Sequence, residues 1–409
     1  MKKYAIILML SVHLAVLSLG LASCGNDQVK TLYVYNWGEY ISDGSEGTLD
    51  VNAEFEKYYL ETYGEEIEVN YSTFSSNESL YDKISSGAVK YDVIIPSDYM
   101  IERMISEGLL AKINFENVPN YQYIADNFKS QNVYYDPDNL YSVPYTYGMV
   151  GVIYNKTLVA EGDSDIGSWS LMWDKDYSGN ILQFNNSRDA FGTALYYLGY
   201  DVNDATEEQW REALNLLKTQ KEIVQGYVMD EIFNKMKSGS AAISSYYAGD
   251  FLTMYEDNND LEFYYPKEGT NIYVDAMCIP AASENQLIAE RYINFMLSEQ
   301  IAVANAEYTC YASPNTLVTN NTEYIEYMKS IHPDAMNILY SENAEVKTTF
   351  YKNLSREKLT MVNSLWEELK IESSIGNSIY IGCGIIVAIL VVFAVFHIIR
   401  KKKRERYDD

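Results

Sequence analysis

Strand-like and helix-like stretches alternate through the first part of this 409-residue chain, and that order limits the folds open to it. Short apolar stretches are followed three times by longer amphipathic ones. The expected strands are Thr31–Tyr35, Ile67–Tyr71 and Tyr91–Ile95, and the expected helices are Thr48–Tyr63, Ser79–Ser86 and Ser97–Glu107. Because strands separated by helices pair in parallel, this order predicts an α/β fold with a mostly parallel, doubly wound sheet.

A second α/β unit occupies the middle of the chain. Its expected extended segments are Val143-Pro144, Met149–Tyr154, Gly179–Phe184, Ala241–Ser245, Phe263–Tyr265 and Asn271–Pro280. Its expected helical segments are Trp169–Asp174, Ala190–Leu198, Glu207–Lys221, Ala289–Leu297, Gln300–Ala306 and Glu357–Leu369. A body of this size favours two domains.

No low-complexity linker separates the two units, so we expect the chain to cross between two lobes more than once and to leave a ligand cleft there. The expected first lobe is 30–145 with about 274–320, and the expected second lobe is 146–273 with about 321–372.

The N-terminus has the features of an export signal over residues 1–23. Lys2 and Lys3 precede a mostly apolar stretch, Tyr4–Gly20. The sequence Leu21-Ala22-Ser23-Cys24 follows and resembles a bacterial lipoprotein box. In such a box the cysteine is lipidated and becomes the first mature residue, so Cys24 is the expected lipidation site.

The C-terminus carries a second membrane signal. Residues Ile379–Ile399 are apolar apart from His397, and a helix of this length reaches about 31 Å, enough to span a hydrocarbon core. A basic run, Arg400–Arg404, follows at once. By the positive-inside rule, the tail 400–409 is expected in the cytoplasm and the body on the extracellular face of the cell membrane.

The charge of the body excludes several classes of partner. The whole chain carries −27; without the +2 of Lys2 and Lys3 and the +3 of residues 400–409, residues 24–399 carry −32. Such a field disfavours nucleic acid and anionic lipid surfaces and concentrates cations. Plain solubility of an exported protein is the other explanation of the charge.

Histidine and cysteine are scarce in the body. His332 is its one histidine, so neither a histidine-based metal site nor a Ser-His triad is expected, and no metal or cofactor is predicted. Cys278 and Cys310 either pair in an oxidising compartment or remain buried free thiols.

One cluster after the first strand suits an organic cation. Trp37, Glu39 and Tyr40 place two aromatic rings beside one carboxylate. A ring face attracts an ammonium group, and a carboxylate accepts a charge-assisted hydrogen bond from it. Taken alone, the same residues are better explained as a strand that ends in a turn with its aromatic side chains in the core.

Similar groups recur near other predicted strands. Because strand ends line the ligand crevice of open α/β sheets, their recurrence favours a binding site. Single members have simpler explanations, since Ser97, Ser187 and Asp189 suit helix N-caps. The further candidates are Ser97 with Tyr99, Asn186 with Asp189, Tyr247 with Asp250, and Tyr273 with Asp275.

Several motifs in order resemble the spermidine/putrescine-binding family, the polyamine-binding proteins of ABC importers. The resemblance covers Leu32 to Leu369. The motifs are Tyr35-Asn36-Trp37-Gly38-Glu39-Tyr40-Ile41, Tyr71-Ser72-Thr73-Phe74, Ser76-Asn77-Glu78, Tyr91-Asp92-Val93-Ile94-Ile95-Pro96-Ser97, Val143-Pro144-Tyr145, Pro266-Lys267-Glu268-Gly269, and Val274-Asp275-Ala276-Met277 with Ile279-Pro280.

The resemblance implies a two-lobed periplasmic-binding-protein fold that closes on a polyamine and delivers it to permease and ATPase subunits without catalysis. It implies a first-lobe wall of Trp37, Glu39, Tyr40, Ser97 and Tyr99. It implies that Asp189, Tyr247, Tyr273 and Asp275 complete the site. The family's last polar contact, near 341–346, is not placed, and the C-terminal span lies outside the family's usual pattern.

Two departures bear on the ligand. Spermidine-preferring members tend to carry an acid where this chain has Asn186. The sequence Tyr247-Ala248-Gly249-Asp250 resembles the Trp-Ala-Gly-Asp of putrescine-preferring members and adds Asp250. Together these departures favour putrescine over spermidine.

Three alternatives stay open at this point. The same fold could bind another small organic cation. Glu39 and Asp275 could be the paired acids of a surface glycoside hydrolase, which holds its two carboxyl groups about 5–10 Å apart. A membrane sensor or adhesin is the third, although the short tail leaves no room for a signalling domain.

Overall fold

The computed structural model describes residues 29–129, 133–340 and 346–371. The predicted signal peptide 1–23, Cys24, the predicted span 379–399 and the tail 400–409 lie outside the described residues. Within the described ranges, no helix is both long and apolar enough to cross a membrane.

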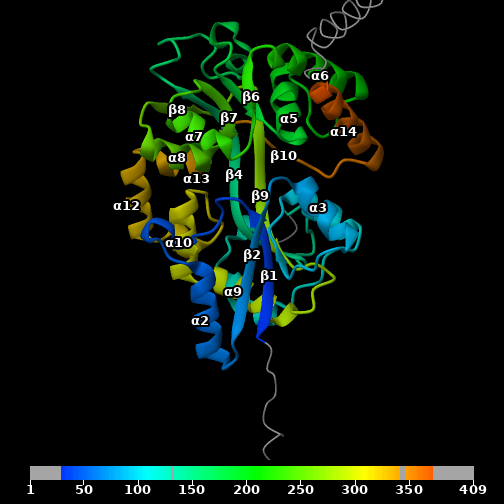
Figure 1. Cartoon of the computed structure of the whole chain (residues 1–409), viewed down its shortest axis with the longest axis vertical. Helices are drawn as coiled ribbons and strands as arrows, with labels where there is room; N and C mark the ends of the chain where they lie inside the picture. The colour runs from blue at the N-terminus through cyan, green and yellow to red at the C-terminus, as the bar shows by residue number, and fades with distance from the viewer. Residues whose placement is uncertain (1–28, 130–132, 341–345, 372–409) are drawn as a thin grey trace, which may run out of the picture.

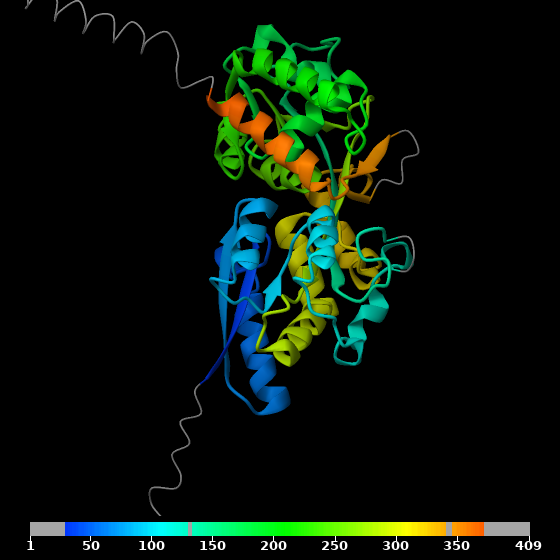
Figure 2. The same cartoon turned by 90° about the vertical axis from the view of Figure 1, so that its right-hand side faces the viewer.

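Two lobes stacked along the long axis of the molecule are visible in Figures 1 and 2. The strands are β1 Lys30–Trp37, β2 Ile67–Phe74, β3 Val93–Ile94, β4 Ser142–Asn155, β5 Ile181–Phe184, β6 Val224–Val228, β7 Ile243–Tyr247, β8 Leu261–Tyr264, β9 Thr270–Cys278 and β10 Thr348–Phe350. The α-helices are α2 Val51–Tyr63, α3 Asn77–Ser86, α4 Asp98–Ser106, α5 Ser187–Leu198, α6 Glu207–Lys221, α7 Glu231–Lys237, α8 Ala248–Asp257, α9 Gln286–Met296, α10 Glu299–Thr309, α11 Thr316–Thr319, α12 Thr322–Ile331, α13 Ala335–Tyr340 and α14 Arg356–Ile371.

The first three strands and helices follow the predicted order. β1 pairs in parallel with β2 and with β3. Local sequence sets the helix ends: the Asp50 side chain caps α2, and Ser76 and Ser79 form a reciprocal capping box on α3. Gly87 ends α3 in the left-handed conformation, as its position after the helix predicts.

The sheet is mixed, and the expectation of a mostly parallel sheet is therefore wrong for its centre. Within the described residues the strand order is β2-β1-β3-β9-β4-β7-β5-β6, with β10 beside β9 and β8 beside β4. β4 pairs antiparallel with β7, β8 and β9 because β4 and β9 return between lobes instead of following a helical crossover. Two separate extended segments were expected where the single strand β4 runs.

β4 and β9 run from one lobe into the other (Figure 1). β4 pairs with β9 over residues 142–149 and with β7 and β8 over residues 150–155. The β4–β9 register shifts between Pro144 and Thr146, as expected where proline removes a ladder donor. Tyr273 and Asp275 therefore lie midway along a paired strand.

Among the described residues, three clusters of buried side chains form the cores. One cluster surrounds β5–β7 and includes Trp169, Phe191 and Trp210. The other two lie on the opposite faces of β1–β3 and β9. Cys278 and Cys310 are both buried free thiols, so of the two open alternatives the structure shows the unpaired one.

Candidate functional site

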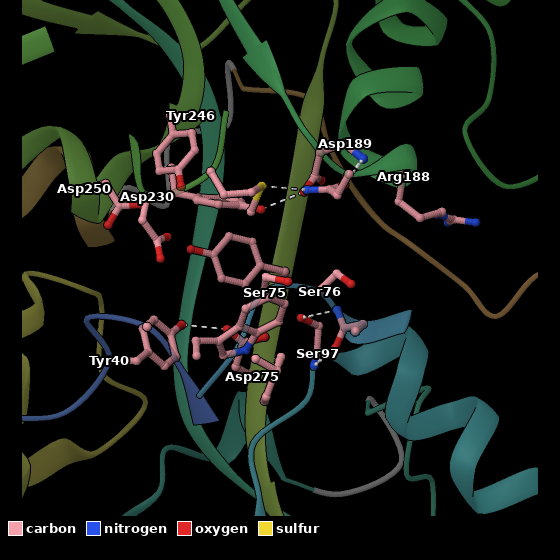
Figure 3. A pocket seen from close by; sticks show the side chains of 18 of the residues that line it. Tyr40, Ser75, Ser76, Ser97, Arg188, Asp189, Asp230, Tyr246, Asp250 and Asp275 are labelled. Atoms are coloured by element: carbon pink, nitrogen blue, oxygen red, sulfur yellow. Dashed lines mark hydrogen bonds between the residues drawn. The ribbon is translucent and has the colours of Figure 1, made fainter. Parts of the chain in front are cut away.

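A cavity lies between the lobes, where β1, β3, β5, β6 and β7 end and β9 passes (Figure 3). Its volume is about 880 Å³, including the solvent at its mouth. All eleven residues predicted from the sequence line it: Trp37, Glu39, Tyr40, Ser97, Tyr99, Asn186, Asp189, Tyr247, Asp250, Tyr273 and Asp275. The structure thus brings together residues more than 230 positions apart in the chain.

Three carboxylates of the cavity each accept a hydrogen bond from one tyrosine hydroxyl. Tyr40 Oη donates to Asp275 Oδ2 at 2.6 Å, and Tyr247 Oη donates to Asp189 Oδ2 at 2.6 Å. Tyr311 Oη donates to Asp250 Oδ2 at 2.8 Å. Each acid thus has one oxygen held by a neutral donor while it faces a shared cavity.

Burial raises the pKa of all three acids. The pKa of Asp250 rises to about 8; burial is the main cause, the hydrogen bond from Tyr311 opposes it, and the charges of Asp230 and Glu39 add to it. The pKa of Asp275 rises to about 6 because of burial, against hydrogen bonds from Ser97 and Tyr40. Burial also raises the pKa of Asp189, against hydrogen bonds from Tyr247 and Asn186. A cation in the cavity would relieve this cost by stabilising the ionised forms.

Aromatic rings fill the walls between the acids. The Trp37 ring lies 4.4 Å from that of Phe74, and its Nε1 is buried without a hydrogen-bond partner in the described part of the chain. Tyr247 and Tyr273 meet edge to face at 5.3 Å. These rings offer faces and edges for methylene groups and ammonium groups.

A polar network supports the first-lobe wall. Asn77 Nδ2 donates to Ser97 Oγ at 3.0 Å and to Tyr99 Oη at 3.1 Å, and Ser97 N–H donates to Asn77 Oδ1 at 3.0 Å. Tyr99 Oη donates to Glu78 Oε1 at 3.2 Å. Ser97 occupies the N-cap position of α4 but its side chain makes no cap hydrogen bond, so the alternative of a simple capping serine is wrong.

The N-cap of α5 is also a different residue from the ones that the sequence indicated. Asn186, not Ser187 or Asp189, is the N-cap: its Oδ1 accepts from Asp189 N–H at 2.8 Å. Asn186 Nδ2 also donates to Asp189 Oδ2 at 2.8 Å. Asn186 therefore contributes mainly by orienting Asp189.

Glu39 lies at the exposed rim of the cavity. Its backbone has φ 51°, in the left-handed region that few residues other than glycine adopt. Its Oε2 accepts a long hydrogen bond, 3.4 Å, from Tyr308 Oη. It is thus the most solvated of the predicted site acids.

Arg188 is the one basic residue among the described residues that line the cavity, and its guanidinium points away from the cavity (Figure 3). It lies 5.3 Å from the Tyr99 ring and 4.6 Å from the Tyr351 ring, and donates to the Lys352 carbonyl. The cavity interior is consequently acidic, which suits cations and not anions.

Sequence reasoning missed several lining residues, notably Asn77, Asp230, Tyr311 and Tyr351. Asn77 lies inside a motif of the family resemblance, so a signal for it existed. Asp230 follows β6, and the rule that strand ends line the crevice would have found it had that strand been recognised. Residues 341–345, where a last polar contact was sought, lie outside the described residues.

One acidic group outside the cavity has ligand-like spacing. Asp163, Asp165 and Asp174 hold carboxylate oxygens within 4.8 Å of one another. Asp163 accepts from Asp165 N–H and Tyr177 Oη, and Asp165 accepts from Ser170 Oγ. Asp174 accepts from Asp176 N–H, so each of the three carboxylates holds a turn between residues 163 and 177.

Comparisons with known proteins agree with this geometry. A family model described as bacterial extracellular solute-binding protein matches residues 52–330. The spermidine/putrescine-binding periplasmic protein of Escherichia coli (strain K12) is 30% identical over 330 residues, covering 80% of this chain and 90% of the relative. The putrescine/cadaverine-binding protein of Pseudomonas aeruginosa is 27% identical over 354 residues, covering 83% and 93%.

A solved structure shares the fold as well. The spermidine/putrescine ABC transporter substrate-binding protein of Streptococcus pneumoniae is 30% identical, with a TM-score of 0.64, covering 84% of this chain and 99% of that one. The predicted two-lobed fold is confirmed. These relatives are solute-binding proteins and not enzymes, which supports the binding interpretation over the glycoside hydrolase. The chain belongs to the bacterial extracellular solute-binding protein family.

Proposed function

We propose that this protein captures polyamines outside the cell and passes them to the permease and ATPase subunits of an ABC importer. The observation that carries the proposal is the cavity in which Asp189, Asp250 and Asp275 face one another among aromatic rings while Arg188 turns away. Protonated amines meet these groups through charge-assisted hydrogen bonds and cation–π contacts. The names of the relatives from E. coli and P. aeruginosa support the same ligand class.

The arrangement of the acids favours a diamine. Figure 3 places Asp250 on one side of the cavity and Asp189 on the other, with Asp275 between lobes below them. An extended four-carbon diamine separates its nitrogens by roughly 6 Å, so it needs an acid toward each end and rings along the middle. Asn186 is neutral and engaged with Asp189, so position 186 supplies no carboxylate for the third ammonium group of spermidine. We therefore propose that putrescine binds more tightly than spermidine.

We propose further that the body is held at the extracellular face by lipid on Cys24 and by a membrane helix over 379–399, with the tail 400–409 in the cytoplasm. The lobes that close on the ligand are proposed to be 30–145 with about 274–320 and 146–273 with about 321–372. The chemistry of both ends supports this attachment, since the lipobox-like sequence and the apolar run followed by basic residues are independent membrane signals.

Calorimetric titration of the full-length protein in detergent tests the ligand. We expect putrescine and spermidine to bind near neutral pH, putrescine more tightly. Asp275→Asn should weaken putrescine by about tenfold or more, because removing one partner of a desolvated charge pair costs about 2–5 kcal/mol. Asp257→Asn is the control, since that residue is paired with Lys237 on the surface. Absence of binding by any di- or triamine would refute the proposal.

Fractionation of cells tests the attachment. Cys24→Ala should block lipidation yet leave the protein in the membrane fraction through 379–399. A stop codon after Ile371 should leave the lipid as the remaining anchor, and only the combination should release the body. Release of the Cys24→Ala protein alone would show that the C-terminal segment is not a stable anchor.

A further inference from the structure

We propose that Asp230 is a specificity-determining residue of the cavity and that it binds the same terminal ammonium group of the ligand as Asp250 does. Gly38 leaves the space that the Asp230 carboxylate occupies. The inference rests on the proposed function and adds to it a residue that the strand-end pattern did not reveal. Asp230 belongs to the second lobe and Gly38 to the first, so the pair also joins the two walls.

The Asp230 side chain lies at the start of a helix but does not cap it. Asp230 precedes α7 at the N-cap position, yet its side chain makes no cap hydrogen bond. Asn186, in the matching position before α5, does cap its helix. The Asp230 carboxylate makes no hydrogen bond or ion pair within the described residues, and it lines the cavity on the same side as Asp250 (Figure 3).

The Asp230 carboxylate lies against Gly38. A Cβ atom built on Gly38 would come within 2.9 Å of Asp230 Oδ2. Gly38 is not among the residues with positive φ, so its backbone accepts alanine without strain. A side chain at position 38 would therefore displace the end of the Asp230 side chain from the place where it lies.

The charged groups that shift the pKa of Asp230 are all acidic. Burial is the main cause of its raised pKa, and the charges of Glu39 and Glu231 add to it. Asp230 and Glu39 in turn raise the pKa of Asp250. Glu39 comes from the first lobe and the two aspartates from the second, so an ammonium group placed among them offsets a repulsion that otherwise opposes contact between the lobes.

Titration calorimetry with putrescine on the full-length protein tests the assignment. Asp230→Asn should weaken binding by about tenfold or more, as expected for a partly desolvated charge partner. Glu231→Gln is the matched control: it removes the same charge from the same helix but lies outside the lining, and its Oε2 accepts from Met229 N–H, a role glutamine keeps. We expect less than a twofold change for it. The ligand-free Asp230→Asn protein should unfold at the same or a higher temperature than wild type.

Double variants separate a shared ammonium from a general loss of charge. If Asp230 and Asp250 serve one ammonium, the losses for Asp230→Asn and Asp250→Asn should be less than additive, while Asp230→Asn and Asp189→Asn should be additive. Gly38→Ala should weaken putrescine in the wild-type background but not in the Asp230→Ala background, where nothing occupies the space.

The outcomes distinguish this inference from the proposed function. If wild type binds no polyamine, the proposed function fails. If wild type binds and Asp275→Asn weakens binding while Asp230→Asn behaves as Glu231→Gln does, the function stands and the role of Asp230 is overturned. Additive losses for Asp230→Asn and Asp250→Asn would overturn the shared ammonium.

Discussion

At the scale of single residues, the cavity keeps acids ready to ionise without leaving them paired with bases. Tyr40, Tyr247 and Tyr311 each donate one hydrogen bond to one aspartate. A neutral donor lowers the cost of the charged form less than an arginine or lysine would, and it does not compete with a cationic ligand. Asp250, whose pKa burial raises to about 8, therefore stays mostly protonated at neutral pH until a cation arrives.

Proton release on binding follows for Asp250. Its pKa of about 8 leaves it mostly protonated in the free protein at neutral pH, and a bound ammonium favours the ionised form. Putrescine binding should release a proton, and affinity should rise as pH rises from about 6 to about 8. Calorimetry in buffers of different ionisation enthalpy measures the release. Asp250→Asn should reduce it, and an unchanged release would place the proton elsewhere.

Stability of the ligand-free protein should change with pH in the opposite direction. Asp250 and Asp275 have folded-state pKa values of about 8 and about 6, above the ordinary aspartate value. Between about pH 4 and about pH 8 the native state thus holds protons that the unfolded state has lost, so the free energy of unfolding falls as pH rises. Urea unfolding across this range checks the sign, and Asp250→Asn should flatten the slope.

At the scale of elements, most of the site residues that the sequence predicted lie at the ends of strands. β1, β3, β5 and β7 were each anticipated, and the residues after them line the cavity. β6, with sequence Val-Gln-Gly-Tyr-Val, was missed because glycine and glutamine weaken the apolar pattern, and Asp230 was missed with it. Tyr311 follows a helix that ends at Cys310 with φ 56°, a helix end without the usual glycine, so local sequence offered no signal.

The start of α5 should set the preference between ligands. Aspartate also caps helices well, so Asn186→Asp should keep the cap while replacing the Asn186–Asp189 hydrogen bond by a second carboxylate. We expect spermidine to gain affinity relative to putrescine by several-fold, since a third ammonium then has a partner. Competition between the two ligands measures the ratio, and an unchanged ratio would remove residue 186 from selectivity.

Packing between β4 and β8 should tolerate no added methyl group. A Cβ on Gly151 would lie 2.3 Å from Phe263 Cζ and 2.6 Å from the Tyr264 carbonyl oxygen. Gly151→Ala should therefore lower the free energy of unfolding by about 1–3 kcal/mol, measured by urea denaturation. Gly226→Ala on β6, where a Cβ meets nothing within 4 Å, is the control and should not destabilise.

At the scale of the whole molecule, the two lobes contact each other around the cavity. Gly38 meets Asp230, Tyr311 bonds to Asp250, and Tyr99 faces Arg188. The sequence predicted two lobes and repeated crossings, but not which groups face each other across them, because those contacts depend on the relative placement of the lobes and not on local pattern.

Closure of the lobes should depend on a cation. Glu39 in one lobe faces Asp230 and Asp250 in the other, so at about pH 8 their repulsion should separate the lobes of the free protein, and a polyamine should draw them together. Small-angle scattering of the detergent-solubilised protein should show a smaller radius of gyration with putrescine than without. Asp250→Asn should bring the free protein nearer the compact form, and added salt should do so in part, because screening weakens exposed pairs most. Glutamate, an anion of similar size, should change nothing. The scattering should be compared at a putrescine concentration that saturates the protein by calorimetry. Identical curves with and without putrescine would contradict closure driven by charge, because the bound cation would then not have moved the lobes together.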